Sequence, residues 1–104
     1  MEQTIVIAGA NGFMGNRCVA ECLLKHKKVI ALARGAEEQT AEARVLTELE
    51  DNMEAYILEP LRENLTVLEY DITQDDLGLS VEMTDRINDE ADLIINFVGD
   101  TNFF

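Results

Sequence analysis

The sequence predicts an α/β fold in which a parallel four-stranded sheet carries helices on both faces. Short apolar runs rich in β-branched residues, typical of buried strands, alternate with longer amphipathic stretches typical of helices. The first run, Thr4–Ile7, leads into G-A-N-G-F-M-G at positions 9 to 15, and a helical pattern follows at once. A strand, a glycine-rich turn and a helix in this order open a doubly wound sheet, so we expect a Rossmann-like strand order of 3-2-1-4.

The three glycines of this turn, spaced three apart, predict a binding site for the pyrophosphate of a dinucleotide. Gly9 suits a turn with positive φ, Gly12 leaves space for a phosphate against the backbone, and Gly15 lets the helix pack closely on the strand. The start of the helix then offers free N–H groups and the positive end of its dipole. The alternative is a tight packing turn without a ligand. The predicted pyrophosphate-binding residues are Gly9, Asn11, Gly12, Phe13, Met14 and Gly15.

Composition and charge narrow the class of protein and its partners. With 104 residues, 47% of them hydrophobic, the chain is expected to form one domain with a buried core. Asp and Glu number 21 against 8 Lys and Arg, and the net charge of −13 argues against nucleic acid and anionic membranes as partners. The N-terminus has no basic segment, and its apolar run is too short for a signal peptide or a membrane span. We therefore expect a cytoplasmic protein.

The first predicted helix, Phe13–His26, contains both cysteines and the single histidine. Cys18 and Cys22 share a helix face, and His26 lies one turn further on. Because these residues supply at most three ligands and the helix leans on the sheet, we predict small buried residues and no metal site. A disulfide between positions i and i+4 of a helix also has unfavourable geometry.

The second predicted strand, Val29–Ala33, is followed by Arg34. In a dinucleotide-binding fold this position lies beside the adenosine ribose, where an acidic residue favours NAD and an arginine pairs with the 2′-phosphate of NADP. Arg34 therefore predicts NADP, with NAD the less favoured cofactor. The alternative is a solvated loop arginine neutralised by Glu37 and Glu38.

A long helical pattern is predicted from Ala36 to Leu58 and ends before Pro60. Its apolar stripe, spaced by three and four residues, faces the sheet. Arg44 lies in its first part and points either to a ribose phosphate or to an ion pair with Glu48, four residues on. The stripe consists of Leu46, Leu49, Met53 and Ile57.

A third strand is predicted over Leu65–Tyr70, with Asp71 and Ile72 at its carboxyl end. There Asp71 can accept a hydrogen bond from the adenine amino group, and Ile72 can pack on the ring. The alternative is that Asp71 is an ordinary turn or cap residue.

The last part of the chain predicts a short helix and a fourth strand. Ser80 is a good N-cap for a helix that runs to about Asn88. The strand follows over Leu93–Val98 and ends in Gly99. We expect residues 1–104 to form the N-terminal portion of an NAD(P)-binding Rossmann domain, truncated before its last strands.

Several motifs in fixed order resemble one known family. The spacing G-x-x-G-x-x-G resembles the extended short-chain dehydrogenases/reductases. A series of short motifs after this turn resembles the N-terminal part of thioester reductase domains. These domains include carboxylic acid reductases, fatty acyl-CoA reductases and the terminal reductases of peptide synthetases. The series covers essentially the whole chain and comprises A-L-A-R at 31–34, A-R-V-L at 43–46, D-I-T at 71–73, L-G-L-S at 77–80 and I-I-N-F-V-G-D-T-N at 94–102.

The resemblance implies roles for particular residues. It implies 2′-phosphate binding by Arg34 and Arg44, and a parent protein that reduces an acyl-carrier or CoA thioester with NADPH to an aldehyde or alcohol. The chain departs from the family at Tyr70, which stands in place of a usual Gly. The resemblance further implies adenine binding by Asp71 and Ile72, and ribose contact by Val98 and Gly99.

The catalytic pattern of this superfamily is missing from residues 1–104. Reduction there uses a Tyr as proton donor and a Lys four residues later. Tyr56 is followed four residues later by Pro60, and Tyr70 by Gln74. We therefore expect nucleotide binding without catalytic residues and no reductase activity of the chain alone. The alternatives are a stand-alone nucleotide-binding or sensor module, a non-catalytic scaffold, or another extended short-chain dehydrogenase or epimerase.

The fourth predicted strand is also a candidate for self-association. In the order 3-2-1-4 the strand Leu93–Val98 is an open edge that is apolar on both sides, and such edges pair with other strands. Phe97, Phe103 and Phe104 lie on it or just beyond it. We expect two or more copies to associate through this edge, and more strongly as salt screens the negative charge.

Overall fold

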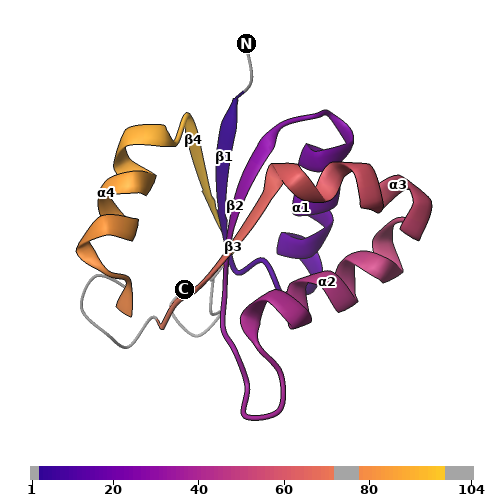
Figure 1. The fold of residues 1–104 in the computed structure, drawn as a ribbon, viewed down its shortest axis with the longest axis horizontal. Helices are drawn as coiled ribbons and strands as arrows, with labels where there is room; N and C mark the ends of the chain where they lie inside the picture. Colours follow the sequence, from indigo (N-terminus) through magenta and orange to yellow (C-terminus); the bar gives the residue numbers. More distant parts are fainter. Residues whose placement is uncertain (1–2, 72–77, 98–104) are drawn as a thin grey trace.

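The computed structural model describes residues 3–71 and 78–97 and shows a four-stranded parallel sheet. The strands are β1 (Thr4–Ala8), β2 (Lys28–Ala33), β3 (Leu65–Glu69) and β4 (Leu93–Asn96). Their order is β3-β2-β1-β4 and every pairing is parallel (Figure 1). The predicted α/β class and the predicted strand order are both confirmed.

Helices cover both faces of this sheet, as predicted. Helices α1 (Phe13–Leu24), α2 (Ala41–Asn52) and α3 (Ala55–Leu61) lie on one side, and α4 (Val81–Glu90) lies on the other (Figure 1). A short 3₁₀ turn, η1 (Arg62–Asn64), connects α3 to β3. Each crossover therefore returns the chain to the same end of the sheet, and all strand carboxyl ends meet at one edge.

The two central strands are buried on both faces, which explains their continuous apolar sequences. Alternate residues of β1 point to opposite sides: Ile5 and Ile7 belong to the core under α1 and α2, and Val6 belongs to the core under α4. Val19 and Leu23 of α1 are fully buried. Among the described residues, the larger core contains fifteen buried residues and the smaller one six, so most of their apolar burial lies beneath α1, α2 and α3.

The prediction of one helix over Ala36–Leu58 was wrong. Thr40 caps the start of α2 by accepting a hydrogen bond from the Ala43 N–H at 3.1 Å, so residues 36–39 form a turn instead. The backbone at Met53 is extended, with φ −154° and ψ 153°, and separates α2 from α3. The apolar period continues across this break because both helices face the same core, so periodicity alone could not locate it.

The first helix ends at Leu24, two residues before its predicted end. His26 adopts a left-handed conformation with φ 59°, and its N–H donates to the Leu23 carbonyl oxygen at 2.9 Å. The Lys27 N–H donates to the Cys22 carbonyl oxygen at 3.0 Å, which completes a Schellman motif. A histidine here fills a position that usually holds glycine, so no residue at this point marks the end of the helix clearly.

Smaller differences affect the other boundaries. The second strand begins one residue early, at Lys28, and the third ends one residue early, at Glu69. The fourth helix runs two residues further than predicted, and its cap is confirmed because Ser80 Oγ accepts from the Met83 N–H at 3.1 Å. The fourth strand ends at Asn96, and Val98 lies outside the described residues.

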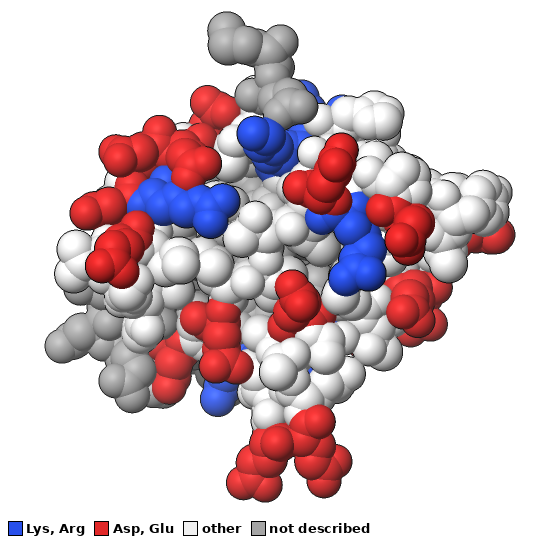
Figure 2. Space-filling model, viewed as in Figure 1, with Lys and Arg blue, Asp and Glu red and all other residues white. Residues whose placement is uncertain are grey.

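The surface reflects the acidic composition. Acidic side chains are spread over the face shown in Figure 2, and basic side chains lie among them singly or in small groups. Within residues 3–71 and 78–97, no helix has the length and apolar character needed to cross a membrane.

Candidate nucleotide-binding site

The glycine turn lies at the carboxyl end of β1 and is fixed by hydrogen bonds to β2. The N–H groups of Gly9 and Ala10 both donate to the Leu32 carbonyl oxygen, each at 3.0 Å. Gly9 has φ 80°, a conformation that L side chains rarely adopt, as the sequence predicted. The Gly12 N–H donates back to the Gly9 carbonyl oxygen at 3.1 Å and closes the turn.

Helix α1 begins directly after this turn. Gly12 is its N-cap and supplies no side-chain hydrogen bond, so it leaves N–H groups of the first turn to other acceptors. Phe13 and Met14 project into solvent with 71% and 62% of their surface exposed. The Arg17 guanidinium lies 5.9 Å from the centre of the Phe13 ring and adds a cation beside this turn, which the sequence analysis missed. This arrangement suits an anionic group at the helix start.

Gly15 sets how closely α1 approaches the turn. A Cβ atom at this position would overlap the carbonyl group of Gly9. The predicted close packing at Gly15 is therefore confirmed, although the atoms approached belong to the turn itself. The helix start is consequently held against the residues that precede it.

Asn16 is fully buried and joins the turn to α2. Its Nδ2 atom donates to the Ala10 carbonyl oxygen at 3.0 Å and to the Val45 carbonyl oxygen at 3.1 Å. Its Oδ1 atom accepts from Asn52 Nδ2 at 2.8 Å. Asn16 was not among the residues predicted from the sequence, where its signal is an amide at a helix position expected to face the core. Asn16 thus fixes the glycine turn and α2 relative to one another.

The two candidate 2′-phosphate-binding arginines lie together at the end of β2. Arg34 is exposed just beyond the strand, and Arg44 is half-buried on α2. Arg44 Nη1 donates to the Arg34 carbonyl oxygen at 2.8 Å. This bond directs the Arg44 side chain at the loop after β2, and its contact with a ribose phosphate stays a prediction.

A polar pocket of about 500 Å³ opens between the ends of β2 and β3. Asp71 lines it, together with Arg34 and the three residues that follow Arg34, so the structure brings two predicted site residues to one cavity. Three other predicted residues, Ile72, Val98 and Gly99, lie outside the described part of the chain. The full lining consists of Arg34, Gly35, Ala36, Glu37, Glu69, Tyr70 and Asp71.

Tyr70 connects this pocket to the glycine turn. Its side chain is 5% exposed and packs in the core under α4. Burial raises the pKa of the Tyr70 hydroxyl, against the lowering effects of a Gly9 backbone hydrogen bond and the Arg34 charge. The phenol therefore stays protonated at neutral pH and lies between the two predicted phosphate-binding regions.

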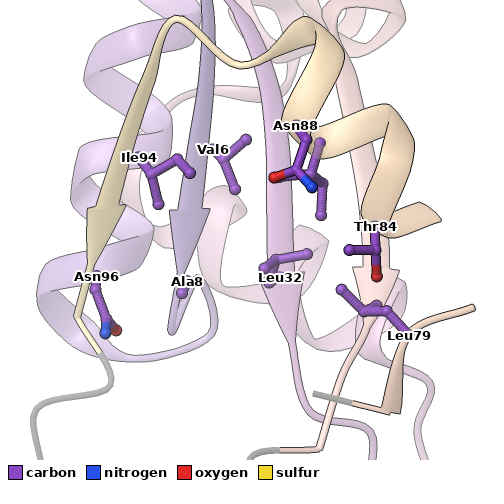
Figure 3. A pocket seen from close by; sticks show the side chains of 9 residues that line it. Val6, Ala8, Leu32, Leu79, Thr84, Asn88, Ile94 and Asn96 are labelled. Carbon is purple, nitrogen blue, oxygen red and sulfur yellow. The ribbon is translucent and has the colours of Figure 1, made fainter. Parts of the chain in front are cut away.

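A second hollow, of about 360 Å³, lies between α4 and the sheet and is mainly apolar (Figure 3). Val6 and Ile94 project from neighbouring strands on one side, and Thr84 and Asn88 of α4 lie opposite. Neither the glycine turn nor Arg34 lines this hollow, so it is distinct from the polar pocket. The remaining lining residues are Ala8, Leu32, Leu79, Ile87 and Asn96.

The cysteines do not form a disulfide and lie in no metal-binding group among residues 3–71 and 78–97. Both Cys18 and Cys22 are half-buried against the larger core, in agreement with the packing role proposed for them. Burial, followed by the neighbouring Cys18, raises the pKa of the Cys22 thiol to about 11. Cys22 is therefore a protonated and poorly nucleophilic thiol at neutral pH.

Comparison with protein families supports the nucleotide-binding assignment. The family model described as male sterility protein matches residues 7–104, from within β1 to the last residue. The chain belongs to this family. It is an NAD(P)-binding domain of the reductase type, and its similarity extends over nearly the whole sequence.

Among curated proteins, the chain is 32% identical over 119 aligned residues to fatty acyl-CoA reductase 1 of Arabidopsis thaliana, covering 97% of this chain and 23% of that enzyme. It is 33% identical over 102 residues to the carboxylic acid reductase of Mycobacterium tuberculosis, covering 90% of this chain and 9% of that enzyme. A carboxylic acid reductase of Segniliparus rugosus is equally similar over the same length. The chain therefore spans less than a quarter of these relatives.

Among solved structures, the chain resembles the terminal R domain of the myxalamid PKS-NRPS biosynthetic pathway, with a TM-score of 0.72 and 28% identity. The match covers 92% of this chain and 24% of that one. Menthone neomenthol reductase of Mentha piperita shares the fold, with a TM-score of 0.64, at 20% identity over 95% of this chain and 32% of that one.

We predict that Gly15→Ala destabilises the protein while Gly12→Ala is tolerated. A methyl group at Gly15 meets backbone that cannot move aside, so we expect the free energy of unfolding to fall by about 2–3 kcal/mol. At Gly12 the same methyl group lies 3.4 Å from the Gly9 carbonyl oxygen, and we expect a loss below about 1 kcal/mol. Urea unfolding of both variants tests this. Equal losses would show that the close approach at Gly15 does not limit stability.

We also predict that Asn16→Ala lowers the free energy of unfolding by about 2–3 kcal/mol, because buried carbonyl oxygens lose their donor. Asn52→Ala is the matched control: it removes the Asn52 bonds to Asn16 Oδ1 and to the Glu48 carbonyl oxygen but leaves both carbonyl bonds of Asn16. Because Asn52 is exposed, water can replace its amide as the donor, so we expect a loss below about 1 kcal/mol. Denaturant unfolding measures both. If Asn52→Ala were as harmful, the carbonyl bonds of Asn16 would not be the important ones.

Proposed function

We propose that residues 1–104 form the N-terminal portion of an NAD(P)-binding domain that binds NADP in preference to NAD. The observation that supports this most directly is the placement of Arg34 and Arg44 at the carboxyl end of β2. Arg34 lines a polar pocket, Arg44 donates to the Arg34 carbonyl oxygen, and α1 begins after the glycine turn at the same edge of the sheet. In this proposal the helix start holds the pyrophosphate, and the arginines hold the 2′-phosphate.

The remaining predicted contacts complete this binding mode. Asp71 lines the pocket in which the adenosine is proposed to lie, with Ile72 against the adenine ring. Val98 and Gly99 follow β4 and are proposed to contact the ribose. Asn11, Phe13 and Met14 flank the pyrophosphate at the glycine turn.

We further propose that the parent protein reduces acyl thioesters carried by CoA or an acyl carrier. The support is the family membership and the similarity to fatty acyl-CoA and carboxylic acid reductases. Residues 1–104 contain no Tyr followed four positions later by Lys, so we assign no catalytic residue within them. The cytoplasmic location expected from the sequence stays a prediction.

The cofactor proposal is tested by Arg34→Ala. Loss of a charge-assisted contact to the 2′-phosphate should weaken NADP binding by about 1–3 kcal/mol and leave NAD nearly unchanged. Isothermal titration calorimetry with NADP and NAD measures both affinities. Arg62→Ala, on the connection between α3 and β3, is a control with the same loss of charge. Equal losses for both nucleotides would show that Arg34 does not recognise the 2′-phosphate.

We also propose that copies of the chain associate through β4. In the described sheet β4 pairs with β1 and is a terminal strand, so no strand among residues 3–71 and 78–97 covers its other edge. Leu93 is 49% exposed and Ile94 is 57% exposed, and their strand partners Ile5 and Val6 belong to opposite cores. The exposed edge is thus apolar on both faces, which favours pairing with a second copy.

Light scattering at low and high salt tests this association. We expect the average mass to increase with salt, because screening weakens the repulsion between acidic surfaces while strand pairing acts at contact. Ile94→Lys should suppress the association through β4. Val81→Lys, which places the same charge on a 75% exposed residue of α4, should not. A monomer at both salt concentrations would contradict the proposal.

A further inference from the structure

The polar pocket contains a carboxylate that the cofactor proposal does not use. Glu69 is the last residue of β3 and pairs in register with Ala33, the residue that precedes Arg34. The Tyr70 N–H donates to the Ala33 carbonyl oxygen at 3.1 Å, so the ends of β2 and β3 are held together at this point. Glu69 therefore lies beside Arg34, the residue proposed to bind the 2′-phosphate on the ribose.

Gly35 determines how near this carboxylate comes to the loop. A Cβ atom at Gly35 would overlap the Glu69 carboxylate, so the absence of a side chain leaves the space that Glu69 occupies. Glu69 and Arg34 both line the polar pocket. Among residues 3–71 and 78–97, no ion pair joins the two side chains, so neither charge is cancelled by direct contact with the other.

The pocket therefore presents opposite charges to the same part of a ligand. A 2′-phosphate carries more than one negative charge at neutral pH, so it is attracted by Arg34 and repelled by Glu69. A ribose 2′-hydroxyl is neutral and donates a hydrogen bond, which a carboxylate accepts. Glu69 thus favours NAD, whereas Arg34 favours NADP.

We propose that Glu69 is a specificity-determining residue that limits the preference of this site for NADP and allows NAD to bind as well. This inference rests on the proposed nucleotide-binding function. A purely structural role is the competing explanation, since the backbone nitrogen of Ala41, at the start of α2, lies 3.5 Å from the same Cβ position of Gly35. A carboxylate near a helix start stabilises the fold without affecting which nucleotide binds.

The test compares Glu69→Gln with wild type, using the whole chain and calorimetric titrations of NADP and NAD. The substitution keeps the shape of the side chain and removes its charge. We expect NADP to bind about three- to tenfold more tightly and NAD to bind equally or more weakly. The gain for NADP should shrink at high salt. Glu69→Ala should change the ratio of the two affinities in the same direction.

Glu63→Gln is the matched control. Glu63 lies just before the opposite end of β3, and its substitution changes the net charge by the same amount. We expect it to leave the ratio of the NADP and NAD affinities unchanged. If Glu69→Gln gave the same ratio as wild type or as this control, Glu69 would not determine specificity and the inference would be overturned.

The outcomes separate this inference from the function on which it rests. If wild type bound neither nucleotide, the proposed function would fail and this inference with it. If wild type bound NADP but the ratio did not respond to Glu69→Gln, only the role of Glu69 would fail. A change in thermal stability without a change in the ratio would assign Glu69 to the structural role and overturn the inference.

Discussion

The close approach between α1 and the glycine turn is the constraint on which the candidate site depends. Gly15 leaves no room for a side chain against the Gly9 carbonyl, so the helix start is fixed relative to the end of β1. The adjacent residue, Asn16, extends this constraint to α2 through hydrogen bonds to the Ala10 and Val45 carbonyl oxygens. Because Arg44 immediately precedes Val45, the position of a candidate phosphate-binding side chain depends on packing that begins at the turn.

The parallel sheet brings residues from distant parts of the sequence to one edge. Gly9, Arg34 and Asp71 each follow a strand, and the order β3-β2-β1-β4 places the ends of those strands side by side. This edge combines an exposed helix start with cations in a chain whose net charge is −13. Local placement of a few charges, rather than net charge, therefore decides whether an anionic nucleotide is attracted to the site.

In the proposed binding mode, the surroundings of the pocket make the choice between NADP and NAD a balance of opposing charges. Arg34 lies among Glu37, Glu69 and Asp71, and Arg44 is directed at the loop by its bond to the Arg34 carbonyl. Tyr70 fills the space between this loop and Gly9 with a buried, protonated phenol. Membership of an NAD(P)-binding family does not fix the preference between NADP and NAD, because that preference depends on these individual side chains.

The sequence by itself determined the fold class, the strand order and the conformations at Gly9 and Gly15. These follow from local rules: buried parallel strands need continuous apolar runs, and a tight turn into a closely packed helix needs glycine. The resemblance to thioester reductases was also carried by short motifs, and the family is confirmed over residues 7–104. The binding roles assigned to the individual site residues stay predictions.

Only the tertiary structure decided features that depend on contacts between distant segments. The break at Met53 was hidden because α2 and α3 present one apolar stripe to the same core. The burial of Asn16 could not be read from its neighbours, since the acceptors and donor that satisfy its amide lie up to 36 residues away. The placement of Glu69 against Gly35 follows from strand register, which brings residues 34 positions apart into contact and which local pattern does not specify.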